Sequence, residues 1–152
     1  MDFSRITDDL FIGTTPEVQD YDYLRSLGVR LVINMRFARG PLPDHHPEAL
    51  DFLWLRSIDS PLLLISIQKL LQGTHHALET IRKGGKVYSH CARGRHRSVA
   101  MGAAILIAQG HSAETAMQLI KLQRPISDPG IFYIRSRILQ FARLWEHLQV
   151  RT

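Results

Sequence analysis

The sequence predicts an α/β fold in which helices cover a mostly parallel sheet of four to five strands. Short β-like runs, bounded by Gly, Pro or charged residues, alternate along the chain with longer segments of helical periodicity. The chain is 45% hydrophobic, which is enough to bury one core at this length. No repeat, low-complexity tract or Ser/Gly linker interrupts it, so we expect a single domain over residues 1–152.

The first half of the chain contains three predicted strands and one predicted helix. Residues 9–13 form an apolar run that ends at a glycine, which favours a strand. A helical pattern follows over about residues 18–27, where Gly28 is placed to cap the helix. Two further apolar runs, 31–35 and 52–56, are bounded by charged residues and predict the next two strands.

The second half contains one predicted strand and four predicted helices. A helical pattern over about residues 65–82 stops at the pair Gly84-Gly85, and residues 86–90 then predict a strand. The remaining helical patterns cover about residues 98–109, 113–122 and 130–148. Because strands and helices alternate, we expect the ligand to bind beyond the carboxyl ends of the strands. The loops 36–46, 57–62 and 91–98 should meet there.

The composition favours anionic ligands. Nineteen Lys and Arg residues against fourteen Asp and Glu residues give a formal charge of +5, although a solvated basic surface would give the same balance. No zinc pattern or recognition-helix signature accompanies the charge, so we expect no nucleic-acid partner. No apolar run is long enough to cross a bilayer and residues 1–5 do not resemble a signal peptide, so we expect a cytoplasmic protein. We also expect a monomer.

The cysteine and histidine residues argue against a metal site. A single cysteine, Cys91, forms neither an internal disulfide nor a multi-thiolate metal site. The pairs His45-His46 and His75-His76 lack the partners of a zinc site, and we expect them in a loop and on the surface. We therefore expect no metal and no organic cofactor. Cys91 is either a small buried apolar residue or a reactive group.

The segment from residue 90 to residue 98, HCARGRHRS, suits a thiolate that attacks phosphorus. In a tight turn between a strand and a helix, the backbone N–H groups from Ala92 to Arg97 would form an anion nest and lower the pKa of Cys91. The guanidinium of Arg97 matches two phosphate oxygens. Gly94 fits a position that is closed to residues with a Cβ.

The residues at the two ends of this segment support it. We expect His90 to lie under the loop and brace it. Ser98, at the start of the helix, is placed to cap the helix and to hydrogen-bond the Cys91 sulfur. Such a bond would ease departure of the thiolate when a phosphocysteine is hydrolysed.

The pattern His90-Cys91-x-x-Gly94-x-x-Arg97-Ser98 resembles the signature of cysteine-dependent protein tyrosine phosphatases, and the length of the chain resembles their compact dual-specificity branch. The resemblance covers about residues 8–146 and includes the segment 27–36 and the pair Arg124-Pro125. It implies the protein tyrosine phosphatase-like fold and a hydrolase that forms a phosphocysteine at Cys91.

Asp59 is the predicted general acid. It lies thirty-two residues before Cys91 and just after the third predicted strand, and the resemblance places the family's proton donor in an equivalent loop. Alternatively, Asp59 caps the next helix or orders a turn at Pro61. Asp44 and Asp51 are weaker candidates because neither follows a strand at this spacing.

One departure from the family concerns the second half of the reaction. Many members carry a glutamine that positions the hydrolytic water, some way past the Arg-Pro pair. Here that stretch, residues 128–136, reads DPGIFYIRS and contains no glutamine. Hydrolysis of the phosphocysteine is then slow, or it depends on Asp59 alone.

The substrate is expected to be a phosphorylated protein, with a phospholipid as the alternative. Substrate contacts are expected from residues of the loop and from Arg36; the loop residues are Ala92, Arg93, Gly94, Arg95 and His96. A basic residue at the position of Arg95 is common in phosphatases of phosphoinositides and of phosphatidylglycerophosphate. The run 62–65, LLLI, is expected in the core, and a membrane-touching or substrate-gripping lid is its alternative.

Three other functions use a similar loop. A rhodanese-type sulfurtransferase has a lone cysteine in an anion-binding loop but needs no Asp59. A phosphate-binding module without catalysis would not need Cys91, Arg97 and Asp59 together. An RNA 5′-triphosphatase fits the basic charge, but no specific residue favours it.

Overall fold

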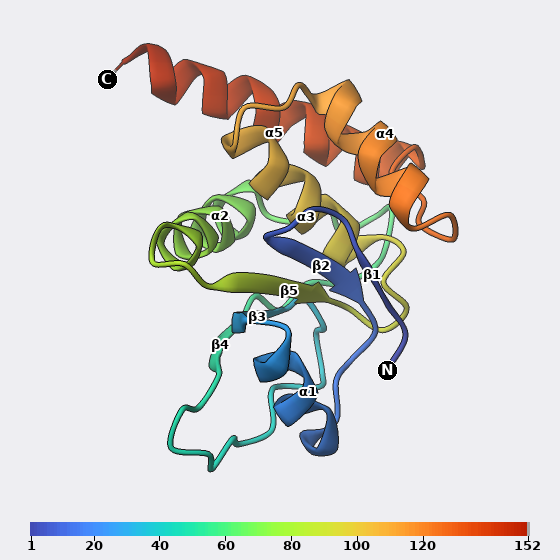
Figure 1. Ribbon diagram of the computed structural model, residues 1–152. Helices are drawn as coiled ribbons and strands as arrows, with labels where there is room; N and C mark the ends of the chain where they lie inside the picture. The colour runs from blue at the N-terminus through green and yellow to red at the C-terminus, as the bar shows by residue number, and fades with distance from the viewer. Residues whose placement is uncertain (152) are drawn as a thin grey trace.

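The predicted α/β fold is confirmed by the computed structural model, which describes residues 1–151. A five-stranded sheet lies between α1 on one face and α2, α3, α4 and α5 on the other (Figure 1). The strands are β1 (Phe3–Arg5), β2 (Leu10–Gly13), β3 (Val29–Asn34), β4 (Asp51–Trp54) and β5 (Lys86–His90). The helices are α1 (Tyr21–Ser26), α2 (Ile67–Arg82), α3 (Arg97–Ala108), α4 (Ala113–Gln123) and α5 (Phe132–Val150).

The strands have the order β1-β2-β5-β3-β4. β2, β5, β3 and β4 are parallel to one another, as expected, and β1 pairs with β2 in the antiparallel direction. The sequence does not predict β1, because its three residues, FSR, form no apolar run. None of the three is fully buried in the structure. The predicted helix 18–27 begins as a 3₁₀ turn, Val18–Asp20, before α1.

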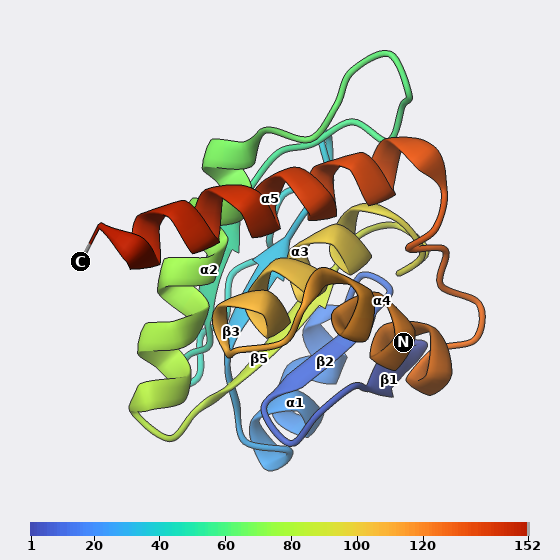
Figure 2. The same cartoon turned by 90° about the horizontal axis from the view of Figure 1, so that it is seen from above.

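Helix α3 occupies the centre of the helical layer. It packs on β2 and β5 and contacts α2, α4 and α5 (Figure 2). All ten residues from Ser98 to Ile107 are buried, which is the pattern of a helix surrounded by core. A Cβ on Gly102 would lie 2.5 Å from the side chain of Ile12, so glycine lets the helix approach the sheet. Within residues 1–151, no helix is long and apolar enough to cross a membrane.

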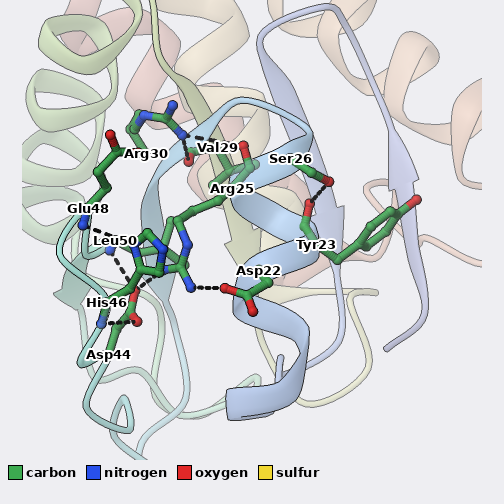
Figure 3. Close-up of polar contacts among 10 residues, drawn as sticks. All are labelled: Asp22, Tyr23, Arg25, Ser26, Val29, Arg30, Asp44, His46, Glu48 and Leu50. Carbon is green, nitrogen blue, oxygen red and sulfur yellow. Dashed lines mark hydrogen bonds and ion pairs between the residues drawn. The ribbon is translucent and has the colours of Figure 1, made fainter.

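The long segment between β3 and β4 is attached to α1 by Asp44 (Figure 3). The carboxylate of Asp44 pairs with the guanidinium of Arg25 and is 5% exposed. It also accepts hydrogen bonds from the backbone N–H groups of Leu50, at 2.8 Å, and His46, at 3.2 Å. Asp44 therefore holds this segment in place, which agrees with its low rank as a candidate acid.

The prediction that residues 62–65 belong to the core is wrong for three of the four residues. Ile65 is buried, but Leu62, Leu63 and Leu64 are 88%, 57% and 47% exposed. The chain makes a turn here that is closed by a bridge between Ser60 and Leu63, and it forms neither a strand nor a helix. Apolar composition alone therefore misplaced these side chains.

We expect Leu70→Ala to lower the free energy of unfolding by about 2–5 kcal/mol, because Leu70 is fully buried in α2 and truncation leaves a cavity. Leu62→Ala is the matched control and should change it by less than about 0.5 kcal/mol. Urea unfolding followed by circular dichroism measures both. An equal loss in the two variants would contradict the exposed position of Leu62.

Candidate active site

The loop that follows β5 lines a cavity at the carboxyl edge of the sheet. This Cys91 loop comprises residues 91–96 and leads directly into α3. The cavity has a volume of about 150 Å³ and is lined by Asp59, Cys91, Ala92, Arg93, Arg95, His96 and Arg97. The structure therefore brings the predicted nucleophile, cation and acid to one place.

Cys91 lies beside the hydroxyl group of Ser98, as the sequence indicates. The distance from Cys91 Sγ to Ser98 Oγ is 3.2 Å. Burial raises the pKa of the Cys91 thiol, but hydrogen bonds from Ser98 and the charge of Arg97 outweigh burial and lower the pKa overall. The geometry therefore favours the thiolate, which is the nucleophilic form of cysteine.

Arg124 fixes the backbone of the Cys91 loop. Its buried guanidinium donates to the carbonyl oxygen of Gly94 at 2.8 Å and to that of Arg93 at 3.1 Å. The same group donates to Ser4 Oγ and Asp2 Oδ2, both at 3.1 Å, and so ties the loop to the N-terminal segment. The sequence indicates the pair Arg124-Pro125 only through the family resemblance and does not predict this structural role.

Gly94 has a positive φ of 64°, a conformation that side chains with a Cβ rarely adopt. A Cβ at this position would also lie 2.8 Å from the backbone of Gly13 and from the guanidinium of Arg124. The loop thus packs directly against the end of β2. This contact agrees with the expectation that position 94 is closed to larger residues.

Arg97 connects the Cys91 loop with the loop that carries Asp59. Its Nη1 donates to the carbonyl oxygen of Ser57 at 2.8 Å. Its Nε is buried and has no hydrogen-bond partner among residues 1–151. The guanidinium is thus held on one side and keeps a donor for an anion that enters the cavity.

Asp59 lies at the centre of a polar cluster, which we call the Asp59 cluster and which comprises Asp59, His96 and Tyr133. Tyr133 Oη donates to Asp59 Oδ1 at 2.7 Å, and His96 Nδ1 lies 2.9 Å from Asp59 Oδ2. The hydroxyl group of Tyr133 and Nδ1 of His96 are 3.2 Å apart. Burial raises the pKa of Asp59, but the bonds to His96 and Tyr133 outweigh burial and lower the pKa overall.

The two remaining predicted residues lie outside the cavity lining. His90 is buried under the loop; burial lowers its pKa to about 3, so its ring is neutral. Arg36 is bonded through Nη1 to Thr15 Oγ1 at 3.0 Å, and Thr15 donates to the carbonyl oxygen of Cys91 at 3.3 Å. Arg36 therefore reaches the Cys91 loop through Thr15. His75, as expected, is exposed on α2.

Sequence reasoning did not identify Tyr133. The segment 128–136 lacks the expected glutamine, and its pattern predicts no role for the tyrosine within it. Tyr133 lies in the first turn of α5 and contacts Asp59 across seventy-four residues, so the sequence has no local signal for this contact. The role of His96 was also missed in part, because its ring contacts Asp59 as well as the cavity.

Because Cys91 is the sole cysteine, the rate of alkylation by iodoacetamide reports on its thiolate alone. We expect half-maximal reactivity at a pH below the ordinary pKa of a thiol. Ser98→Ala should move the midpoint to higher pH, because it removes a hydrogen bond to the thiolate, whereas Ser26→Ala should not move it. A wild-type midpoint at the value of a free thiol would contradict this account.

Comparison with known proteins places the chain in a family. No family model matches it. Dual specificity phosphatase 28 of Mus musculus is 31% identical over 132 residues, which cover 85% of this chain and 77% of that protein. The crystal structure of human DUSP28 is 26% identical, covers 97% of this chain and 95% of its own, and has a TM-score of 0.81. The crystal structure of PTPMT1, at 24% identity, covers 99% and 100% with a TM-score of 0.85 and supports the fold alone. The chain therefore belongs to the dual-specificity phosphatase family.

Proposed function

We propose that residues 1–152 form one catalytic domain that removes phosphate from phosphotyrosine, and from phosphoserine and phosphothreonine, in proteins. The observation that carries this proposal is the meeting of Cys91, Arg97 and Asp59 around one cavity of about 150 Å³. The names of the relatives, which are dual-specificity phosphatases, support a protein substrate.

In the first step, the thiolate of Cys91 attacks phosphorus and the bond from phosphorus to the leaving oxygen breaks. Arg97 and the backbone N–H groups of the Cys91 loop stabilise the negative charge on the remaining phosphate oxygens. Asp59 gives its proton to the leaving oxygen, so that the product departs as a neutral alcohol or phenol. The products of this step are the dephosphorylated side chain and a phosphocysteine.

In the second step, water attacks the phosphocysteine and inorganic phosphate leaves. The carboxylate of Asp59 accepts a proton from the attacking water, which restores the acid. The sulfur of Cys91 departs as a thiolate, and the hydroxyl group of Ser98, 3.2 Å away, stabilises it. The cycle therefore needs no metal and no organic cofactor.

A phospholipid is the second candidate substrate, because of the exposed leucines on the loop that carries Asp59. Leu62, Leu63 and Leu64 lie three to five residues after the proposed acid and project into solvent. Such an apolar loop beside a basic cavity fits an enzyme that works at a lipid surface. PTPMT1, which has the same fold, has a crystal structure in complex with PI(5)P.

We expect Cys91→Ser to reduce phosphate release from an aryl phosphate by at least about 10³-fold, because the nucleophile is lost. With phenyl phosphate, whose leaving group needs the acid, Asp59→Asn should reduce phosphate release by about 10²-fold, since the proton donor is removed. Asp51→Asn, on β4 outside the cavity lining, is the matched control and should keep full activity. Phosphate release by Cys91→Ser at the wild-type rate would contradict the phosphocysteine mechanism.

A substrate panel separates the two candidates. We expect faster release from phosphotyrosine and phosphothreonine peptides than from phosphoinositides or phosphatidylglycerophosphate in vesicles. The opposite preference, together with selective loss of vesicle activity in Leu62→Ser/Leu63→Ser, would establish the lipid function instead. Silence on every substrate, with thiocyanate formed from thiosulfate, would replace both by sulfur transfer.

A further inference from the structure

Two side chains from different elements converge on the proposed acid. Tyr133 belongs to the first turn of α5, and His96 is the last residue of the Cys91 loop. Tyr133 contacts one carboxylate oxygen of Asp59 at 2.7 Å, and His96 contacts the other at 2.9 Å. The two rings pack edge to face, with centroids 5.8 Å apart. Both oxygens of Asp59 therefore have a partner, which fixes the plane of the carboxyl group.

The protonation states follow from the surroundings. Burial and the bond to Asp59 raise the pKa of Tyr133 to about 12, so its hydroxyl group stays protonated and donates. When Asp59 is ionised, Nδ1 of His96 must carry a proton to donate to Oδ2. The other nitrogen, Nε2, has no hydrogen-bond partner among residues 1–151 and lies 3.8 Å from Asp128 Oδ2.

The charged groups around the Asp59 cluster come from three sides. The segment before α5 contributes the carboxylate of Asp128, and the start of α3 contributes the cation of Arg97. The Cys91 loop contributes the thiolate of Cys91, the exposed cation of Arg93 and the partly buried cation of Arg95 to the shared cavity. A carboxyl group without its own contacts would be drawn toward these cations.

We propose that Tyr133 and His96 are positioning residues that hold the carboxyl group of Asp59 in the orientation needed for proton transfer to the leaving oxygen. This inference rests on the proposed function. Tyr133 lies in the segment that lacks the expected glutamine. Within residues 1–151, the hydrogen bonds from His96 and Tyr133 are the side-chain hydrogen bonds that orient the carboxyl group of Asp59.

The positioning bonds also affect the acidity of Asp59. Both bonds favour the carboxylate, since each donor interacts more strongly with the charged form than with the acid. Their removal should therefore raise the pKa of Asp59. The pH at which kcat/KM begins to fall should therefore be higher, because Asp59 stays protonated to a higher pH. Below that pH, kcat/KM itself should be lower, because the carboxyl group of Asp59 is no longer held in its orientation.

The test compares a good and a poor leaving group, 4-nitrophenyl phosphate and phenyl phosphate. Only the poor leaving group needs a well-placed acid, whereas damage to the loop slows both. Tyr133→Phe removes one hydroxyl group, and Tyr23→Phe makes the same change on the exposed face of α1. His96→Ala removes the second donor, His96→Asn keeps an N–H at a similar position, and His76→Asn is the control on α2.

We expect Tyr133→Phe and His96→Ala each to reduce kcat/KM for phenyl phosphate by about tenfold, the value of one hydrogen bond to a charged group. The value for 4-nitrophenyl phosphate should change by less than about twofold in Tyr133→Phe. In His96→Ala, which also alters the cavity lining, it should fall less than the value for phenyl phosphate. His96→Asn should restore most of the loss. In Tyr133→Phe, the fall of kcat/KM at high pH should begin at a higher pH than in the wild type.

The outcomes separate this inference from the proposed function. If Asp59→Asn shows the leaving-group effect and Tyr133→Phe behaves as Tyr23→Phe does, the proposed function stands and the positioning role is wrong. If Tyr133→Phe and His96→Ala slow the hydrolysis of the two substrates equally and leave the pH profile unchanged, Tyr133 and His96 have only a structural role. If the wild type releases no phosphate, or Asp59→Asn equals the wild type, the proposed function and this inference both fail.

Discussion

The bonds from Arg124 to the Cys91 loop are the contacts on which the rest of the site depends. A turn that gathers backbone N–H groups around an anion must turn carbonyl oxygens elsewhere, and two of these, at Arg93 and Gly94, are taken up by one buried guanidinium. The close contact between Gly94 and Gly13 leaves the loop little room to relax. The lowered pKa of Cys91 depends in part on this fixed backbone, because the backbone N–H groups of Arg93 and Ser98 interact with its sulfur.

The site balances two opposite requirements. A thiolate and a phosphate need cations and dipoles, which the Cys91 loop supplies, but the same cations stabilise the ionised form of a neighbouring acid. In the free protein the pKa of Asp59 is lowered, because the hydrogen bonds from His96 and Tyr133, with a smaller effect from the charge of Arg97, outweigh burial. An incoming phosphate dianion would oppose this effect, because a second negative charge beside Asp59 favours its protonated form. Substrate binding therefore favours the protonated form of Asp59, which is the form that acts as the general acid.

Much of this arrangement could be predicted from the sequence. The strands β2, β3, β4 and β5 and the Cys91 loop follow from local patterns, and parallel pairing brings their carboxyl ends together. The positions of Tyr133, Arg124 and Leu62 could not be predicted in the same way. Tyr133 meets Asp59 across seventy-four residues, and Arg124 meets Ser4 across one hundred and twenty, so neither contact leaves a local signal. Leu62 lies in an apolar run typical of a core, but no helix or strand of residues 1–151 covers its side chain.

The phosphocysteine is the central claim, and rapid acid quenching of wild-type protein during turnover of an aryl phosphate tests it most directly. Mass spectrometry of the digested protein should find a phosphate group on the peptide that contains Cys91, and none in Cys91→Ser. The amount should rise in Asp59→Asn if loss of the base slows hydrolysis more than attack. Steady turnover without a phosphorylated Cys91 peptide at any quench time, or with phosphate on a different peptide, would contradict the account.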